Sequence, residues 1–454
     1  MQNFIQIKRI NPSKKPVNER INTYEEIYNL YKNDEAASQA SRCVQCGDPY
    51  CHTRCPLNNY IPFWLKAVRE GDLQKAFYLS NESSPFPEIM GRVCPQDRLC
   101  EGSCTLNDGY EAVSIGSIEK YITEEGFKQG FKLNFKPVTG DKKVAIIGSG
   151  PAGLSVATFL LRAGIAVDVY EKEKKAGGLL TYGIPNFKLD KNVVQRRVDL
   201  LKENGMNLIT NTKVGKDISF DEIYEKYDAV FVGVGAKKSR MPGIENENAK
   251  NSYPAMKFLV NIQNKLFKEK CDIDVNDKKV LVIGGGDTAM DCVRTAIREK
   301  ASKVICAYRR DEKSMPGSKK EFYNAKEEGA KFIFNATPIK VLVNENNEVI
   351  GVEMQKTKIV DRKVKIIENS EFVIDCDIVI FALGFSHQKL EFLKNYVEFD
   401  KWGAIKVNKN YQTKDKKIFA GGDAIRGADL VVTAARDGRE AAKAIYDLLN
   451  NKKG

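Results

Sequence analysis

Apolar residues in the first third of the chain recur at helical spacing, and this pattern predicts a group of short helices. Residues 24–31 and 63–68 place apolar side chains three and four positions apart, which puts them on one face of a helix. Four prolines between residues 56 and 87 interrupt the pattern, and helices are expected to begin or end there. We expect the helical region to end near residues 136–140.

From Lys143 onward the pattern changes to short apolar runs that are followed by glycines and then by amphipathic stretches. This order is typical of strand–turn–helix units in a parallel sheet, and it occurs twice, over residues 144–171 and 280–310. Further strands are expected at 332–334, 341–343 and 349–352, and the tail from Ile418 again has the order strand, glycine turn, helix. The sequence therefore predicts an α/β fold with two Rossmann-like domains, preceded by an α-helical domain.

Composition and charge fit a globular protein of several domains. The chain has 454 residues, of which 42% are hydrophobic and 29% charged, enough for two or three cores of ordinary size. The net charge is +12 with a pI near 9.0, but the lysines are scattered among acidic residues, which favours a solvated surface over a nucleic-acid site. No apolar stretch approaches the ~20 residues of a membrane span, and the N-terminus lacks a secretory signal's apolar core. We expect a cytoplasmic protein with no membrane or nucleic-acid partner.

Seven of the eleven cysteines lie close together before residue 105, in a spacing that predicts metal centres. Reducing compartments disfavour disulfides, and closely spaced thiolates can hold a compact cluster. Prolines directly after two of these cysteines resemble the Cys-Pro ending of bacterial ferredoxin ligand runs. A zinc site would use four thiolates and leave three over, so iron–sulfur clusters are favoured over zinc. The predicted ligands are Cys43, Cys46, Cys51, Cys55, Cys94, Cys100 and Cys104.

An eighth ligand is needed if this segment holds two four-iron clusters. Each cubane takes four protein ligands, so seven cysteines leave one iron to a different donor. Glu119 follows shortly after Cys104 at an expected helix start and offers a carboxylate oxygen. The competing interpretation is that Glu119 is an ordinary carboxylate on the solvent-facing side of a helix. Its position in the sequence, taken alone, favours this interpretation. In ferredoxin-like runs the last cysteine often serves the other cluster, so Cys55 can belong with the later group.

The first strand–turn–helix unit carries the glycine fingerprint of a dinucleotide site. Gly148, Gly150 and Gly153 form G-x-G-x-x-G after an apolar run. They allow a tight turn, close approach of a pyrophosphate to backbone amides, and contact between helix and strand. The second strand of the unit ends in Glu171, where a carboxylate accepts hydrogen bonds from a ribose diol. We predict a dinucleotide site here rather than a purely structural turn.

The second unit has the opposite charge at the end of its second strand. Its turn is G-x-G-x-x-A, and the strand ends in two arginines instead of an acid. Guanidinium groups there can grip a 2′-phosphate through charge-assisted hydrogen bonds, which favours NADPH over NADH. The alternative is a pair of ordinary surface arginines. The residues predicted to meet this nucleotide are Gly284, Gly286, Asp287, Thr288, Ala289, Arg309 and Arg310.

Two nucleotide sites in one chain suggest a fixed flavin in the first and an exchangeable nicotinamide in the second. The tail supports this assignment, because Gly422 and Asp423 follow a strand and place an acid where it can meet ribityl hydroxyls. A helix opening near Val432 and Thr433 would aim its N-terminus at a flavin carbonyl. We therefore expect FAD and NADPH as cofactors, together with two 4Fe-4S clusters.

Four stretches resemble the small (beta) subunit of bacterial NADPH-dependent glutamate synthase, and the likeness covers essentially the whole chain. The same electron-input module is found in the N-terminal part of dihydropyrimidine dehydrogenase. The stretches are GRVCPQDRLCEG at 91–102, GGLLTYGIP at 177–185, GGGDTAMDC at 284–292 and YRRD at 308–311.

This resemblance implies how ligands and domains are divided. One cluster would be held by Cys43, Cys46, Cys51 and Cys104, and the other by Cys55, Cys94, Cys100 and Glu119. Dihydropyrimidine dehydrogenase differs in having glutamine at the place of Glu119. The implied domains are a helical domain with two clusters (1–140), a discontinuous FAD domain (141–241 and 385–454) and an NADPH domain (242–384). The loop 177–185 would pack along the flavin ring through Gly178, Leu179, Tyr182 and Ile184.

By the same resemblance, the chain oxidises NADPH, passes hydride to FAD and sends single electrons through the clusters. The receiver would be a large (alpha) subunit, in a hetero-oligomer, that makes glutamate from glutamine and 2-oxoglutarate. Flavin is needed because hydride carries two electrons and a cluster accepts one. Positioning of the nicotinamide is sufficient for the first step, so no catalytic acid or base is predicted. Two alternatives stay open: the flavin subunit of an electron-bifurcating NADH-dependent ferredoxin:NADP oxidoreductase, and a non-catalytic zinc-binding scaffold.

Overall fold

Short helices make up the first third of the chain, as the spacing of its apolar residues predicts. The computed structural model describes residues 3–450. The helices are α1 (Asn3–Gln6), α2 (Val17–Arg20), α3 (Asn33–Ala40), α4 (Tyr50–Arg54), α5 (Ile61–Arg69), α6 (Leu73–Ser83), α7 (Pro87–Val93) and α8 (Ile115–Lys128). Prolines stand in the first turns of α5 and α7, where their fixed φ suits a helix start. Trp64 and Phe77 are fully buried in the core that these helices share.

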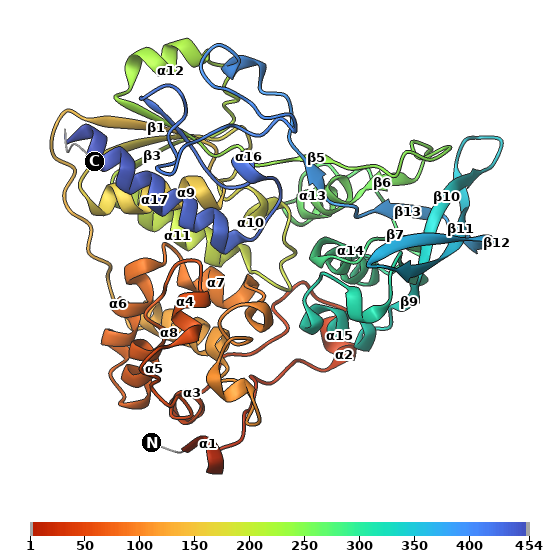
Figure 1. The fold of residues 1–454 in the computed structure, drawn as a ribbon, viewed down its shortest axis with the longest axis horizontal. Coiled ribbons are helices and arrows are strands. Elements are labelled where there is room, and N and C mark those ends of the chain that lie inside the picture. Colours follow the sequence, from red (N-terminus) through yellow and green to blue (C-terminus); the bar gives the residue numbers. More distant parts are fainter. Residues whose placement is uncertain (1–2, 451–454) are drawn as a thin grey trace.

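A five-stranded parallel sheet follows, and it contains the first strand–turn–helix unit (Figure 1). Its elements are β1 (Lys143–Ile147), α9 (Pro151–Arg162), β2 (Ala166–Tyr170), α10 (Leu179–Tyr182), α11 (Lys191–Glu203), β3 (Met206–Ile209), α12 (Phe220–Lys226), β4 (Ala229–Val232), β15 (Ile418–Ala420), α16 (Asp423–Arg426) and α17 (Val431–Leu449). The strand order is β15-β4-β1-β2-β3, and all neighbours are parallel. Because β15 comes from the tail, this sheet is assembled from two separate stretches of sequence.

A second parallel sheet repeats this arrangement around the other predicted unit. Its elements are β6 (Ser252–Pro254), α13 (Ala255–Leu266), β7 (Lys279–Ile283), α14 (Asp287–Arg298), β8 (Lys303–Tyr308), α15 (Lys319–Glu327), β9 (Lys331–Phe334) and β13 (Ile378–Phe381). The strand order is β6-β13-β7-β8-β9. In both sheets the glycine turn leaves the carboxyl end of an inner strand, β1 or β7, which is where open α/β sheets bind ligands. The predicted α/β fold with two Rossmann-like units is confirmed.

Antiparallel strands extend from the second sheet. They are β10 (Ala336–Val343), β11 (Val349–Val360) and β12 (Lys363–Asp375), and the hairpin of β11 and β12 projects from the molecule (Figure 1). The strands expected at 332–334, 341–343 and 349–352 lie within β9, β10 and β11. Two short strands, β5 (Lys238–Ser239) and β14 (Phe385–Ser386), pair where the chain passes between the two parallel sheets.

A fully buried ion pair joins the helical part to the first parallel sheet. Arg197 on α11 donates to both carboxylate oxygens of Glu88 on α7, at 2.7 and 2.6 Å, and neither side chain has exposed surface. Arg197 also donates to Asn81 Oδ1 at 3.2 Å. These contacts hold the helical part against the sheet that carries the first glycine turn.

Arg197→Ala is expected to destabilise the protein by about 3–5 kcal/mol, because it leaves the Glu88 carboxylate buried and unpaired. Urea denaturation measures this change in the free energy of unfolding. Arg196→Ala is the matched control, since Arg196 pairs with Glu124 at 2.8 Å but has a side chain that is 33% exposed. Its expected loss is about 1 kcal/mol. Equal losses for the two variants would contradict the role given to the buried pair.

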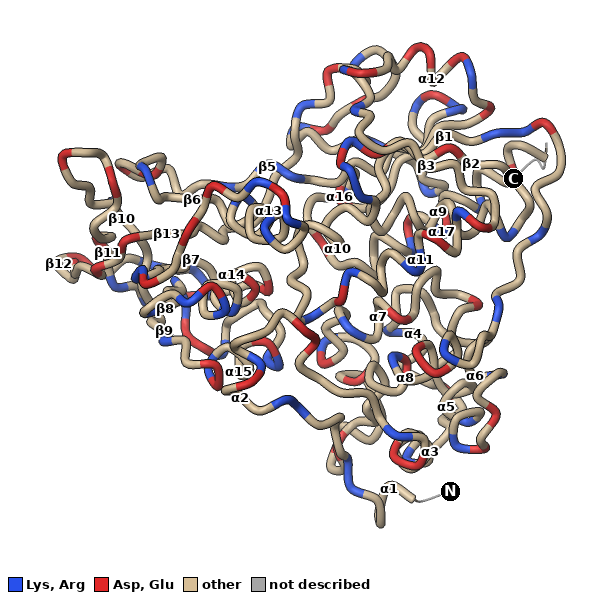
Figure 2. Tube along the Cα trace, turned by 180° about the vertical axis from the view of Figure 1, so that it is seen from behind, with Lys and Arg blue, Asp and Glu red and all other residues tan. Residues whose placement is uncertain are grey.

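Charged residues of both signs are interleaved over the molecule. Figure 2 shows Lys and Arg positions alternating with Asp and Glu along the trace, as expected of a solvated surface. Among the helices of residues 3–450, none combines the length and the apolar character needed to cross a bilayer.

Candidate functional site

A cavity of about 610 Å³ lies against the first glycine turn. Gly148 has φ +97°, and a Cβ there would meet the Gly233 carbonyl oxygen at 2.7 Å. A Cβ on Gly153 would meet the Gly148 carbonyl oxygen at 2.0 Å. A Cβ on Gly150, in contrast, would have no heavy atom within 4 Å. The turn is therefore packed tightly at two glycines and open to a ligand at the third. The volume is in the range of cofactor sites.

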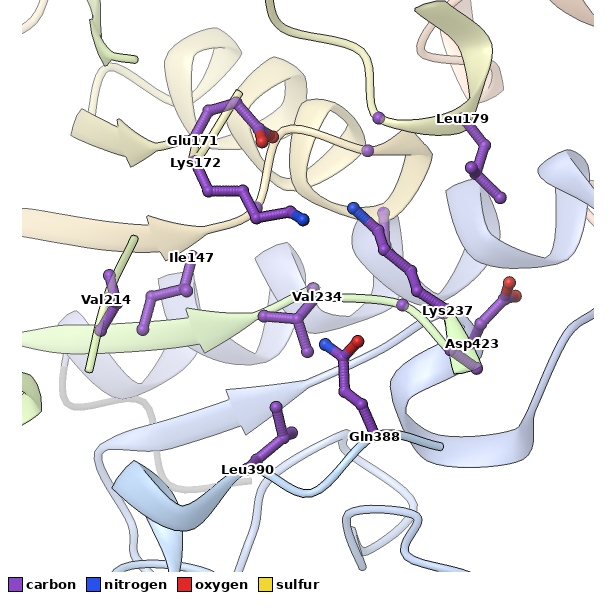
Figure 3. Close-up of a pocket in the computed structure, with 18 of the residues that line it drawn as sticks. Ile147, Glu171, Lys172, Leu179, Val214, Val234, Lys237, Gln388, Leu390 and Asp423 are labelled. Carbon is purple, nitrogen blue, oxygen red and sulfur yellow. The ribbon is translucent and has the colours of Figure 1, made fainter. Parts of the chain in front are cut away.

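Glu171 is one of the side chains that line this cavity (Figure 3), and its carboxylate is hydrogen-bonded to the turn. It is 3% exposed and accepts hydrogen bonds from the Ser149 amide at 3.1 Å, the Ser149 hydroxyl at 2.5 Å and the Glu173 amide at 3.0 Å. A carboxylate has about four lone-pair sites, so it can still accept from a ribose diol. Glu171 can thus both shape the turn and bind a nucleotide.

Gly422 and Asp423 also line the cavity, and Gly422 is held there by a residue that the sequence analysis missed. Asp437 is fully buried and accepts from the Gly422 amide at 2.9 Å, the Tyr411 hydroxyl at 3.0 Å and the Arg426 guanidinium at 2.7 Å. Its place on the apolar stripe of α17 is the signal that could have found it, because an unpaired acid is rarely buried.

Burial raises the pKa of Asp423 from its ordinary 3.8 to about 7. The folded protein therefore binds this proton more tightly than the unfolded chain, so stability is expected to fall as pH rises from about 4 to about 7 and then to level off. Asp423→Asn should remove this part of the slope. Thermal unfolding of the cofactor-free protein across that pH range measures it, and an unchanged slope in the variant would mean that other groups set the pH dependence.

The loop expected to meet the flavin lies partly in the cavity. Gly178 and Leu179 line it, and Leu179 is drawn among its side chains in Figure 3. Tyr182 and Ile184 are not among the lining residues. The Tyr182 hydroxyl accepts from the Lys175 amide at 3.1 Å, and Ile184 packs against the hydrophobic core. These two residues hold the loop in shape without reaching the cavity.

A buried lysine, also missed from the sequence, ties this loop together. Lys191 Nζ donates to the carbonyl oxygens of Leu180 at 3.0 Å and Leu189 at 3.1 Å, and to that of Ile184. Burial lowers the pKa of its ammonium group to about 7. Lysine is usually a surface residue, so composition and spacing give no cue to this position.

The start of α17 separates the nucleotide cavity from a second, smaller one. Leu430 and Val431 line the nucleotide cavity, and Val432 lines the smaller cavity. Thr433 lines neither, and its hydroxyl donates to the Leu430 carbonyl oxygen at 2.7 Å. Consecutive residues of one segment therefore form the wall between the two cavities.

The seven clustered cysteines divide between this smaller cavity and a third one. The smaller cavity is lined by Cys55, Cys94, Cys100 and Glu119, and the third by Cys43, Cys46, Cys51 and Cys104. The division matches the one that the family resemblance implies. All eleven cysteines are free thiols. Burial raises the pKa of Cys51 to about 12 and those of Cys94 and Cys100 well above the ordinary value, so a metal would be needed to hold them as thiolates.

Glu119 shares its cavity with three cysteines. Its Oε1 accepts from Asn59 Nδ2 at 3.3 Å, and within residues 3–450 it makes no ion pair. Burial raises the pKa of Glu119 to about 8. A carboxylate in such a place lacks a counter-charge, which a metal centre would supply.

The eight donors that line these two cavities are twice the number that one zinc ion takes. Among residues 3–450, no three His, Cys, Asp or Glu side chains converge as the ligands of one metal ion do. Zinc requires its sulfurs at ~2.3 Å from one centre, whereas a four-iron cube is itself large and holds its ligands further apart.

The second glycine turn is covered by the loop that follows β8. A Cβ on Gly284 would meet a backbone oxygen at 2.4 Å, whereas a Cβ on Gly286 would have no heavy atom within 4 Å. The Gly317 amide donates to a carbonyl of the turn at 3.1 Å, and the Ser318 amide donates to Asp287 Oδ1 at 2.9 Å. The loop 315–318 therefore lies directly on the turn.

Arg309 and Arg310 stand at the end of β8, the strand next to β7. Arg309 is exposed and Arg310 half-buried, and neither guanidinium makes a hydrogen bond or ion pair within the described part of the chain. Thr288 is half-buried and Ala289 fully buried in the first turn of α14. Two guanidinium groups that make no hydrogen bond or ion pair with residues 3–450 are available to bind a phosphate.

Two family models match the chain. The model described as dihydropyrimidine dehydrogenase domain II, 4Fe-4S cluster, matches residues 20–131. The model described as pyridine nucleotide-disulphide oxidoreductase matches residues 142–438. The first match covers most of the helical part, and the second covers both parallel sheets.

Individual relatives match over nearly the whole chain. The glutamate synthase (NADPH) small chain of Escherichia coli K12 is 47% identical over 98% of this chain and 98% of its own. The putative oxidoreductase AegA of the same organism is 47% identical over 97% of this chain and 70% of its own. Among solved structures, Mycobacterium tuberculosis FprA in complex with NADPH aligns with a TM-score of 0.59 at 19% identity, over 70% of this chain and 85% of its own, which shows a shared fold. The chain therefore belongs to the glutamate synthase NADPH small-chain family, and its larger part is a pyridine nucleotide-disulphide oxidoreductase.

Proposed function

We propose that this chain is the NADPH-oxidising, electron-input subunit of a glutamate synthase. It binds NADPH at the second glycine turn and FAD in the 610 Å³ cavity. It delivers single electrons through two 4Fe-4S clusters to a large (alpha) subunit that makes glutamate from glutamine and 2-oxoglutarate. When bound, FAD supplies the conversion of a two-electron donor into one-electron transfers.

The contiguity of the three cavities is the observation that carries this proposal. Leu430 and Val431 line the nucleotide cavity, and the next residue, Val432, lines the cavity of Cys55, Cys94, Cys100 and Glu119. Ile115 lines that cavity and also the cavity of the other four cysteines. Neighbouring cavities thus share a lining residue or are lined by consecutive residues of one segment. Electron carriers bound in them would lie next to one another, as electron transfer from one to the next requires.

Each proposed contact uses the ordinary chemistry of its residue type. Glu171 accepts ribose hydroxyls, Asp423 accepts ribityl hydroxyls, and Gly150 leaves room for the pyrophosphate. Arg309 and Arg310 bind the 2′-phosphate. The protein's contribution to hydride transfer is to position the two rings, so no side chain has to donate or accept a proton.

The proposal includes the ligand sets and domain limits that the resemblance implies. The helical domain (1–140) carries both clusters, the FAD domain is built from 141–241 and 385–454, and the NADPH domain spans 242–384. We further propose that the chain works in the cytoplasm as part of a hetero-oligomer.

A second candidate is an oxidoreductase with a different electron acceptor. AegA, a putative oxidoreductase, has the same identity to this chain as the Escherichia coli small chain. The flavin subunit of an electron-bifurcating ferredoxin:NADP oxidoreductase is one such enzyme.

Anaerobic purification of the tagged chain from its native organism distinguishes these candidates. A large glutaminase-bearing chain is expected to co-purify, and the complex should make glutamate from glutamine, 2-oxoglutarate and NADPH while the isolated chain does not. Recovery of a small flavin protein, with ferredoxin reduction by the complex, would contradict the glutamate synthase assignment.

A further inference from the structure

The nucleotide cavity contains a lysine that the glycine fingerprint does not explain. Lys237 follows β4 and lines the cavity. In Figure 3 its side chain extends from near Asp423 in the direction of Lys172, and the two positive charges repel each other. Glu171 lies on the far side of Lys172 in the same view. Lys237 therefore reaches the region between the residues proposed to bind the two ends of FAD.

Lys237 has no hydrogen-bond or ion-pair partner among residues 3–450, whereas Lys172 pairs with Glu173 at 2.9 Å. Burial lowers the pKa of Lys237, and the charge of Lys172 lowers it further, against the opposing effect of Glu171 and Glu173. A half-buried ammonium next to another cation needs an anion to offset its lost hydration.

We propose that Lys237 binds the pyrophosphate of FAD. The inference rests on the proposed flavin cavity and adds a charged residue to it. Helix α9 begins at Pro151, directly after the turn, and a helix start of this kind is where dinucleotide pyrophosphates bind. Gly150 is the open position of that turn. The ammonium of Lys237 offers the positive charge that backbone amides supply only in part.

The affinity of the cofactor-free protein for FAD tests this assignment. Lys237→Met is expected to weaken FAD binding about 10- to 100-fold, the loss typical of one hydrogen bond to a charged group, as measured by flavin fluorescence titration. Lys237→Arg keeps the charge and should recover most of the affinity. Lys238→Met is the matched control: it removes the same charge from the next residue, whose side chain is exposed, and should bind FAD as the wild type does.

Competition by fragments identifies which part of FAD meets Lys237. ADP contains the pyrophosphate and adenosine does not, so Lys237→Met should weaken competition by ADP and leave that by adenosine unchanged. Wild-type FAD affinity in this variant, or equal losses for ADP and adenosine, would overturn the inference. Thermal unfolding shows whether each variant folds, and Lys237→Gln provides a second neutral replacement if the methionine variant does not. A wild-type protein that binds no FAD would instead contradict the proposed function, so the two failures are distinguishable.

Discussion

Replacement of both Arg309 and Arg310 by alanine is expected to raise the KM for NADPH about 100-fold while leaving the KM for NADH within about threefold of its wild-type value. The two guanidinium groups stand at the end of β8 without a hydrogen bond or ion pair to any residue of 3–450. Their charge is therefore available to the 2′-phosphate, which NADH lacks. Steady-state reduction of an artificial dye with either nucleotide gives both constants.

Arg362→Ala is the control for this double variant. Arg362 lies in the exposed turn between β11 and β12, so the change removes an arginine from the same region of the chain without touching the glycine turn. Both constants should stay at their wild-type values. A double variant that loses NADPH and NADH binding to the same extent would refute the phosphate contact.

Glu119→Ala is expected to remove roughly half of the iron from the protein, because one of two four-iron clusters loses a ligand. The cavity of Cys55, Cys94 and Cys100 contains Glu119, whereas the other cavity holds four cysteines of its own. The second cluster should therefore survive. Iron analysis, together with electron paramagnetic resonance of the chemically reduced protein, counts the clusters that remain.

Glu119→Gln is the matched control, since glutamine keeps an oxygen donor on a side chain of the same length. This variant should retain most of its iron. If Glu119→Ala also retains all of its iron, another group holds that position and the carboxylate is not a ligand.

The parts of the fold that depend on local pattern could be predicted from the sequence. The two glycine units and the strands near 332–334, 341–343 and 349–352 follow from apolar runs and turn residues that lie next to one another in the chain. Strand β12 did not stand out, because most of its residues are exposed to some degree and charged residues interrupt its alternation. The two-residue strands β5 and β14 are too short to leave any pattern.

Candidate site residues could be predicted where the residue type itself carries the chemistry, as with the clustered cysteines and the turn glycines. Asp437, Lys191 and Lys237 were missed because their importance comes from burial. Each is a charged residue that most often lies on a surface, whereas here Asp437 and Lys191 are buried and Lys237 is half-buried. Composition and spacing give no cue to the two lysines, whereas the apolar stripe of α17 is a local cue to Asp437.

The cofactor content of the chain, purified without oxygen, tests the proposed electron relay most directly. The protein is expected to be brown and to contain one FAD and roughly eight irons per chain, as two four-iron clusters require, and NADPH should bleach its flavin absorption. A colourless protein without iron and flavin would have no electron carriers, and that result would contradict the account.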